Sequence, residues 1–415
     1  MVQREDVHVV AARQPLDEPQ QGRHDALASG GVDASRHHQA DPHKNMIRTR
    51  TQRLTKDAKA TKRAALRRAT VAVAICIAIG SIVRAARTTL DIYFIDVEGG
   101  QSTLLVTPAG QSLLVDAGFP GDGTFASLPG DPSKARDAQR IVAAARDAGV
   151  ARIDYLLLTH FHADHDGGIV ELSQLMPIRT FIDHGTVPPI AEENVPGTLK
   201  AFEEYAAVRA KGRHLEPAPG ARLPLKGVDA IVVSAAGSAI ATPLAGAGQV
   251  TPGCQPAPPA PDEPHENPRS TGFQLRFGRF SMLDVGDLTG QPFYDLACPK
   301  SRVGPVDVYL VAHHAGADAA DAATFAAFRP RVAVFNNGAT KGGAPQTFAS
   351  LHALPSVDVW QLHRSTRPGA QNFADERIAN LDETTSHWIK ISARRDGSFA
   401  VTNARTGQVR RYGAR

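Results

Sequence analysis

The feature that most constrains this chain is the stretch LLLTHFHADHDGG at residues 156–168. An apolar run typical of a strand ends there, and His160, His162, Asp164 and His165 follow within six positions. Because alternate residues at a strand end point to the same side, His160 and His162 can reach one ion together, and Asp164 and His165 then face a second position. Imidazole and carboxylate ligands suit zinc, iron or manganese. We therefore predict a metal site here, rather than a surface loop that happens to be rich in histidine.

Composition and charge narrow the class of protein. The 415 residues are 42% hydrophobic and 21% charged, which is ordinary for a globular chain with an extensive core. The net charge of +4 is uneven, because residues 44–68 contain ten Lys and Arg against the single Asp57. The remainder is not basic and shows no groove in which basic and aromatic residues alternate. A nucleic-acid substrate is therefore a hypothesis that the charge pattern does not support.

The N-terminal segments look like targeting sequence. Residues 1–66 are predicted to be a disordered, basic region, with Met46 as a candidate true start. Residues 67–88 are predicted to be a signal peptide, because the uncharged run 69–83 is short for a membrane span and follows basic residues. An uncleaved membrane anchor is the alternative. We expect export to the periplasm or out of the cell.

The three cysteines permit one disulfide after such a cleavage. Cys76 lies within the apolar run, which leaves Cys254 and Cys298. In an oxidising compartment these two can pair, although two free thiols fit the sequence equally well. Neither has another Cys or a His at the spacing of metal ligands, so we do not count them as ligands.

The folded domain is predicted to span residues 90–415. Three short strands separated by Gly and Pro turns come first, strands and helices then alternate, and the second half repeats this pattern. Such an order fits two sheets packed face to face with helices outside. The predicted elements are strands 92–97, 102–107, 112–116 and 155–159, helices 133–148 and 169–175, then strands 273–277, 279–284, 306–312, 332–335 and 357–362 with a helix over 319–327.

Several motifs together resemble the metallo-β-lactamase fold hydrolases over approximately residues 90–370. They are HFHADH with its Gly pair, LLVDAG upstream, and LDVGD and VAHHAG downstream. Within that superfamily, IYFIDVEGGQS and ENPRSTGFQLRFG look most like the branch with the extracellular domain of DNA-uptake competence proteins and a phosphorylcholine esterase. The resemblance implies an α+β, four-layer αββα sandwich with two divalent metal ions at the sheet edges. Zinc is the first expectation, with manganese or iron as alternatives.

The resemblance also implies a ligand set. His160 and His162 match the first-site histidines, Asp164 and His165 match the second-site pair, and Asp287 matches the carboxylate that bridges both ions. An Asp that follows a strand and a Gly turn projects from the sheet edge, where its two oxygens can bind two cations. Its alternative role is to cap the following segment.

His313 and His314 form the next pair. Adjacent strand residues point to opposite sides, so only one of them is expected to bind metal. Comparison with the serine-glycine-histidine form of the motif favours His314 as the ligand and His313 as a catalytic acid or hydrogen-bond donor facing the substrate. The reverse assignment is the alternative.

The sixth ligand departs from the family pattern. The usual histidine before the strand that leads to the bridging Asp is not plainly present, and alignment on Ser270 places Glu266 there, with His265 and Asn267 beside it. A carboxylate or a shifted His would then complete the first site. The sequence is therefore compatible with two bound metal ions and also with one tightly and one weakly bound ion.

Four further features surround the predicted centre. Asp116 is expected to support the metal loop by hydrogen bonds and not to coordinate. Gln101 stands where competence-type domains have an acid, and His184 is interpreted as a surface or packing histidine. The Pro-rich segment 251–268 is either a lid or a surface insertion.

The chemistry that this pattern predicts is metal-dependent hydrolysis. Two cations would lower the pKa of a bridging water and give a hydroxide nucleophile held by Asp287, while His313 stabilises developing charge. By analogy the first expected substrate is a phosphodiester or related ester, with lactones and β-lactams as alternatives. A degenerate metal-binding protein without activity, and redox chemistry on a di-iron version of the site, are further alternatives. Any contact with a membrane is expected only through residues 69–83.

Overall fold

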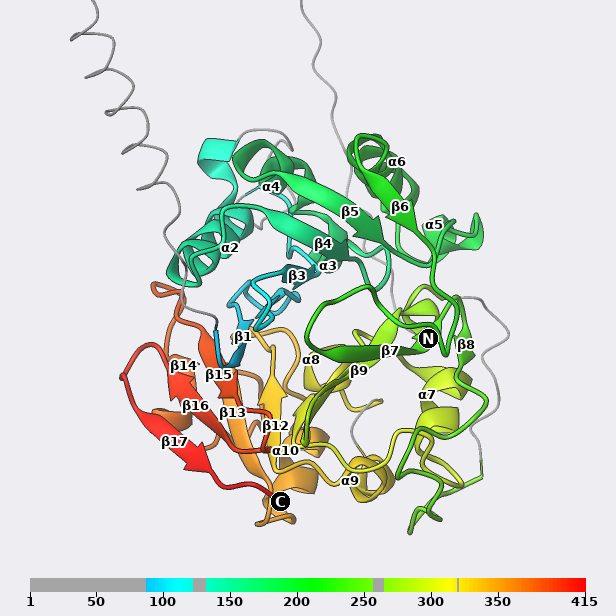
Figure 1. Ribbon diagram of the computed structural model, residues 1–415, viewed down its shortest axis with the longest axis vertical. Coiled ribbons are helices and arrows are strands. Elements are labelled where there is room, and N and C mark those ends of the chain that lie inside the picture. Colours follow the sequence, from blue (N-terminus) through cyan, green and yellow to red (C-terminus); the bar gives the residue numbers. More distant parts are fainter. Residues whose placement is uncertain (1–86, 122–131, 257–264, 319–320) are drawn as a thin grey trace, which may run out of the picture. The chain divides into compact units, whose positions relative to one another are not determined.

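The computed structural model describes residues 87–121, 132–256, 265–318 and 321–415 (Figure 1). The predictions for residues 1–66, for the apolar run 69–83 and for the middle of the Pro-rich segment lie outside the described residues. Among those that are described, no helix has the length and apolar character needed to cross a membrane.

The strands form two mixed sheets. In spatial order the nine-stranded sheet contains β17 (Val409–Tyr412), β16 (Phe399–Asn403), β15 (Ile389–Ala393), β1 (Leu90–Phe94), β2 (Thr103–Val106), β3 (Ser112–Val115), β4 (Ile153–Leu157), β5 (Ile178–Ile182) and β6 (Arg213–Leu215). The eight-stranded sheet contains β14 (Ile378–Asn380), β13 (Asp358–His363), β12 (Val332–Phe335), β11 (Val308–Leu310), β10 (Phe280–Asp284), β9 (Gly272–Phe277), β7 (Asp229–Ala235) and β8 (Ser238–Ala239).

Helices follow the strands in each half of the described chain (Figure 1). Those of the first half are α2 (Arg136–Asp147), α3 (Ala163–Asp166), α4 (Ile169–Leu175), α5 (Ile190–Asn194) and α6 (Thr198–Arg209). Those of the second half are α7 (Gly290–Ala297), α8 (Ala312–Ala315), α9 (Ala322–Phe328) and α10 (Pro345–His352). Short 3-10 turns lie at Pro132–Lys134, Asn267–Arg269 and Asp375–Arg377.

Period-two alternation in the strands explains the layers. In β1, Ile92 belongs to the core between the sheets and Tyr93 to the core beneath α2, α4 and α6. In β11, Val308 faces the other sheet and Tyr309 packs against α9. Because successive side chains point to opposite faces, each central strand supplies two cores. Three cores separate four layers, which confirms the predicted αββα sandwich.

The element boundaries agree best where the sequence pattern is strongest. Helix Ile169–Leu175 and strand Val332–Phe335 have their predicted limits. The strand predicted over 306–312 is confined to Val308–Leu310, because the chain enters a tight turn before the two histidines. The helix predicted over 319–327 spans Ala322–Phe328, where the Asp321 side chain caps it by accepting a hydrogen bond from Thr324 N.

The topology brings distant loops to one edge of the sandwich. β3 and β4 are parallel neighbours in one sheet, as are β10 and β11 in the other. The loops that follow the carboxyl ends of β4, β10 and β11 contain the predicted ligands other than Glu266, which precedes β9. A disulfide joins Cys254 to Cys298 and so ties the Pro-rich segment to the end of α7. The sequence alone had left this pairing open.

Candidate metal centre

The HADH loop is held in place by close backbone packing. His160 and His165 are fully buried, and α3 begins immediately after His162. The following glycines allow the loop to approach the strand before it, since a Cβ on Gly168 would lie 2.2 Å from the carbonyl oxygen of Ala117. The Gly pair of the motif therefore serves packing as well as the start of α4.

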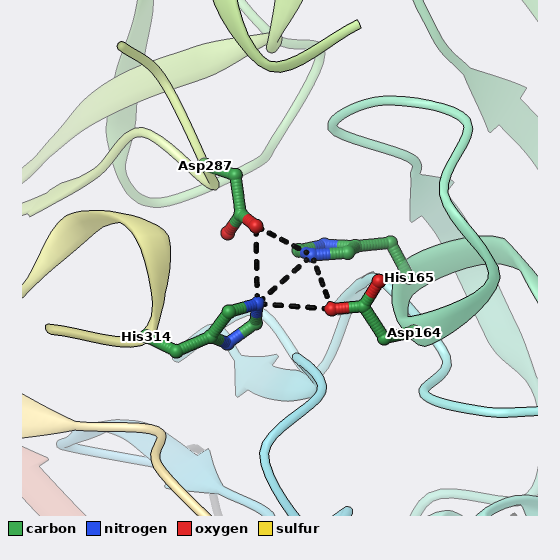
Figure 2. A group of neighbouring side chains, drawn as sticks. All are labelled: Asp164, His165, Asp287 and His314. Atoms are coloured by element: carbon green, nitrogen blue, oxygen red, sulfur yellow. Dashed lines mark hydrogen bonds and ion pairs between the residues drawn. The ribbon is translucent and has the colours of Figure 1, made fainter. Parts of the chain in front are cut away.

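Asp164, His165, Asp287 and His314 converge into what we call the four-residue group (Figure 2). The Nε2 atom of His314 lies 3.0 Å from Oδ2 of Asp164 and 3.0 Å from Oδ2 of Asp287. The Nε2 atom of His165 lies 3.3 and 3.2 Å from the same two oxygens. Four ligand atoms from two sheets thus face one another across a small space.

The four-residue group fits a divalent cation. Its ligand atoms all lie within 4.8 Å of one another, and two imidazoles with two carboxylates are a donor set for zinc, manganese or iron. Oδ1 of Asp287 is buried and has no hydrogen-bond partner among the described residues. A buried carboxylate oxygen is costly without a partner. An ion in contact with Asp287 would satisfy it.

Electrostatics in the site follow from burial and close charges. Burial raises the pKa of Asp164, but Lys341 and His165 hold it well below its usual range. Burial lowers the pKa of His165, but Asp287, Asp164 and Asp116 raise it well above the usual value. Burial, together with His165, lowers the pKa of His160. Burial raises the pKa of Asp287, but His314 and His165 hold it well below its usual range. Both carboxylates of the four-residue group are therefore ionised, as ligands of a cation must be.

Asp116 supports the loop as the sequence predicts. Its Oδ1 accepts a hydrogen bond from Thr159 N at 2.7 Å, and its Oδ2 lies 2.8 Å from Thr159 Oγ1 and 2.7 Å from His165 Nδ1. The second ring nitrogen of His165 is thereby held, which directs Nε2 into the four-residue group. Hydrogen bonds of this kind fix the orientation of metal-binding histidines.

The double histidine is arranged differently from the sequence expectation. His313 and His314 do not alternate along a strand, because both have left-handed backbone conformations with φ of 50° and 52°. Together with Ala315, whose φ is 62°, they make three such residues in succession and form a tight turn, which is strained for side chains larger than Gly. The turn places His314 in the four-residue group and leaves His313 further out, with its Nε2 3.8 Å from Asp287.

His160, His162, His184 and Glu266 lie beside that group and are here called the flanking group. His160 Nε2 is 3.0 Å from His162 Nδ1. Glu266 lies outside the four-residue group, and its Oε2 accepts from Phe161 N at 3.2 Å and contacts His184 Nε2 at 3.0 Å. His184, which the sequence suggested was a packing histidine, is thus the partner of Glu266 at the site. His184 and Glu266 are 82 residues apart, so no local sequence motif predicted that they would meet.

A chain of amides connects the two sheets beneath the site. Gln101 Nε2 donates to Asp284 at 3.2 Å, and Asn336 Nδ2 donates to Gln101 Oε1 at 3.2 Å. Asp284 in turn accepts from Gly286 N at 3.1 Å, in the turn that leads to Asp287. Burial raises the pKa of Asp284 to about 7. Gln101 therefore acts as an amide bridge at the position where the resemblance expects an acid.

A cavity of about 410 Å³ borders the four-residue group. His313, His314, Lys341 and Arg367 contribute to its walls. Lys341 forms an ion pair with Asp164, and Arg367 donates to the carbonyl oxygen of Gly342 at 3.0 Å. Arg367 was not predicted from the sequence, where its place soon after a strand end was the only signal.

Comparison with known proteins agrees with this architecture. Residues 96–252 match the model of the metallo-beta-lactamase superfamily. An atrochrysone carboxyl ACP thioesterase from Passalora fulva is 32% identical over 111 residues, which are 27% of this chain and 29% of the relative. The chain thus spans less than a third of that relative's length.

Two solved structures are similar at low identity. A novel metallo hydrolase from Ignicoccus hospitalis is 14% identical, with a TM-score of 0.36 over 69% of this chain and 100% of that one. CmlA, a diiron beta-hydroxylase from Streptomyces venezuelae, is 16% identical, with a TM-score of 0.32 over 60% of this chain and 44% of that one. The resemblance to the competence-protein branch stays a prediction. Residues 96–252 match the metallo-β-lactamase superfamily, and the two helix-covered mixed sheets have the metallo-β-lactamase fold.

Proposed function

We propose that this chain is a metal-dependent hydrolase whose substrate is a phosphodiester or a related anionic ester. The observation that carries the proposal is the four-residue group at the wall of a cavity that also contains Lys341 and Arg367. A divalent ion held by this group supplies a Lewis acid for a substrate oxygen and lowers the pKa of water.

His313 is the residue best placed to handle a proton. Its Nδ1 is 2.9 Å from both carboxylate oxygens of Asp318, and its Nε2 lies 3.8 Å from Asp287 Oδ2 and 3.4 Å from Asn267 Nδ2. A carboxylate that holds one ring nitrogen fixes the orientation of the imidazole, so that the other nitrogen can serve as an acid or base. We assign to Nε2 of His313 the donation of a proton to the departing oxygen.

The cavity favours an anionic substrate. Lys341 and Arg367 are cationic, and Asp318, which is paired with His313, is the acidic residue of the described cavity wall. Arg presents a planar fork of donors that matches phosphate oxygens. Because Lys341 is paired with Asp164, Arg367 supplies the positive charge for a substrate at this wall, in a domain that is not basic.

Thioester hydrolysis is the second candidate. It is favoured by the 32% identical relative, which is named as a thioesterase, although the match covers only 29% of that protein. A thioester is neutral at its reacting carbon and gains less from Arg367 than a phosphodiester does. Lactones and β-lactams remain further alternatives for the same chemistry.

The test is a substrate panel on the full-length protein with zinc or manganese. We expect hydrolysis of bis(p-nitrophenyl) phosphate to exceed that of a thioester, a lactone and nitrocefin, and to disappear in Asp287→Ala. Arg367→Ala should raise KM for the phosphodiester about tenfold, the loss of one charge-assisted contact, with little change for the thioester. Activity on the thioester alone, unaffected by Arg367→Ala, would refute the phosphodiester proposal in favour of the second candidate.

A matched control is available at Asp396. Its carboxylate accepts hydrogen bonds from Ser398 in a hairpin beside Arg279. Arg279 precedes β10, so this hairpin lies at the opposite end of that strand from Asp287. Asp396→Ala should retain wild-type activity.

We also infer that the protein acts in an oxidising compartment after export. The Cys254–Cys298 disulfide supports this, because such bonds persist in secreted and periplasmic proteins. Cell fractionation that finds the mature protein only in the cytoplasm, with both thiols free, would contradict export.

A further inference from the structure

We infer that Asp96, Glu98 and His363 form a separate binding site for a divalent metal ion. This cluster uses none of the residues of the four-residue group or of the flanking group. Asp96 and Glu98 follow β1 of the nine-stranded sheet, and His363 is the last residue of β13 in the eight-stranded sheet. An ion there would join the two sheets.

The three side chains converge on one point. Nε2 of His363 lies 3.0 Å from Oδ1 of Asp96 and 3.1 Å from Oε2 of Glu98, and the three ligand atoms lie within 4.8 Å of one another. An ion that binds ligands at 2.0–2.2 Å and right angles keeps neighbouring ligand atoms roughly 3 Å apart. The observed separations match that spacing.

His363 provides an independent sign of a missing ligand. Its side chain is fully buried, and neither ring nitrogen has a hydrogen-bond partner among the described residues. Because Nε2 is close enough to both oxygens for a hydrogen bond, the failure is one of direction: the ring nitrogen is not aligned with either oxygen. A buried polar atom without a partner is expensive, and a cation between the carboxylates would remove that cost.

Arg140 completes the arrangement without occupying the site. Its guanidinium binds Oδ2 of Asp96 at 3.1 Å and Oε1 of Glu98 at 3.0 Å, so each carboxylate has its other oxygen directed to His363. Such contacts are how proteins orient carboxylate ligands. The two carboxylates carry one negative charge more than Arg140 neutralises. Although burial lowers the pKa of His363, Asp96 and Glu98 raise it to about 9, so this charge is balanced either by a protonated His363 or by a metal ion that displaces the proton.

The loop around Glu98 is built tightly. Glu98 has a left-handed backbone with φ of 55°, which is uncommon for a residue with a long side chain. A Cβ added to Gly338 would lie 2.5 Å from the carbonyl oxygen of Glu98. The surrounding backbone therefore holds Glu98 in a strained conformation, as is common at functional sites.

One imidazole and two carboxylates indicate the class of ion. Hard oxygen ligands with a single nitrogen suit manganese, iron(II) or zinc, and three protein ligands leave coordination positions for water. Glu98 is the only one of the three with appreciable exposure, at 14% of its side chain, so it marks the side from which an ion would enter.

The test counts ions in the full-length protein. Chelator-treated wild type, Asp287→Ala, His363→Ala and the double variant are dialysed against manganese or zinc, and bound metal is measured by mass spectrometry. We expect His363→Ala to bind one equivalent fewer than wild type, and the double variant one fewer than Asp287→Ala. Because ions are counted and not turnover, the result is independent of the proposed function.

The competing interpretation is an ion pair in which a protonated His363 lies between the two acids. Equal metal content in wild type and His363→Ala, with His363→Lys as stable as metal-free wild type, would overturn the inference. Metal should also raise the unfolding temperature of Asp287→Ala more than that of the double variant.

Two further variants keep the test secure. Glu98→Gln preserves shape and a contact with Arg140, and should weaken binding of the extra ion at least about tenfold if His363→Ala proves unstable. His352, at the end of α10, contacts the carbonyl oxygen of Gln371 and lies in neither metal cluster, so His352→Ala should bind the wild-type number of ions.

Discussion

The four-residue group and the flanking group lie side by side yet differ in how their polar atoms are satisfied. In the first, two histidines and two carboxylates from different sheets face a common centre. In the second, His160 and His162 face each other, and Glu266 is turned to His184 and to a backbone amide. Both groups carry histidines from the same HFHADH motif.

The difference shows what determines a ligand's position. The orientation of His165 is fixed by Asp116, and the turn at His313 and His314 directs His314 inward. Glu266 instead lies near the end of the Pro-rich segment, whose anchor is the Cys254–Cys298 disulfide. Hydrogen bonds at the ends of strands therefore position the four-residue group. Glu266 of the flanking group is instead positioned by a long connection. We expect metal affinity to be greater in the four-residue group.

The largest effect is expected for Asp287→Ala. Asp287 contacts His165 and His314 at 3.2 and 3.0 Å, so its loss opens the four-residue group. Hydrolysis should fall by at least about a hundredfold, the scale for removing one electrostatic contact to the reacting centre. Steady-state kinetics beside Asp396→Ala measures it, and a decrease of less than about tenfold would contradict a catalytic role for this group.

Asp116→Asn should have the next largest effect. The amide keeps the size of the side chain but removes the charge that holds His165 Nδ1 and Thr159. Loss of such a supporting contact typically lowers metal affinity about 10–100-fold. Competition with a fluorescent chelator gives the affinity. An unchanged value would show that His165 is oriented by packing and not by Asp116.

Glu266→Gln is expected to reduce activity by at most about tenfold, because the amide oxygen can still accept from Phe161 N. His184→Gln should have a similar effect if the two side chains act as a pair. A loss as large as that of Asp287→Ala would instead make Glu266 a ligand of equal rank and would remove the distinction between the two groups.

The smallest effect on activity is expected for Cys254→Ser. The disulfide closes a loop of 44 residues, and the chain-entropy model gives a stabilisation of up to about 4 kcal/mol for such a loop. Denaturant unfolding should show that loss, while activity should change less than about twofold. A much larger decrease in activity would mean that the anchored segment positions Glu266 for catalysis.

Local motifs predicted the parts of the fold and site that depend on short-range pattern. The apolar run ending at His160, the Gly turn before Asp287 and the period-two strands each carry their information within a few residues. The αββα layers and the support from Asp116 followed from these and from family resemblance, and the structure agrees.

Pairings between distant residues were not predictable in the same way. His184 meets Glu266, and His363 meets Asp96 and Glu98, only because strands from different parts of the chain end near one another. No spacing rule links such positions in one sequence. The left-handed turn at His313 and His314 was also missed, since histidine adopts that conformation too rarely for its presence to predict it.

The most direct test of a metal-dependent centre is the metal content of the full-length protein, measured by mass spectrometry after dialysis against zinc or manganese. Wild type is predicted to retain at least one equivalent that Asp287→Ala lacks. Wild type without bound metal, or Asp287→Ala with the same content as wild type, would contradict the account.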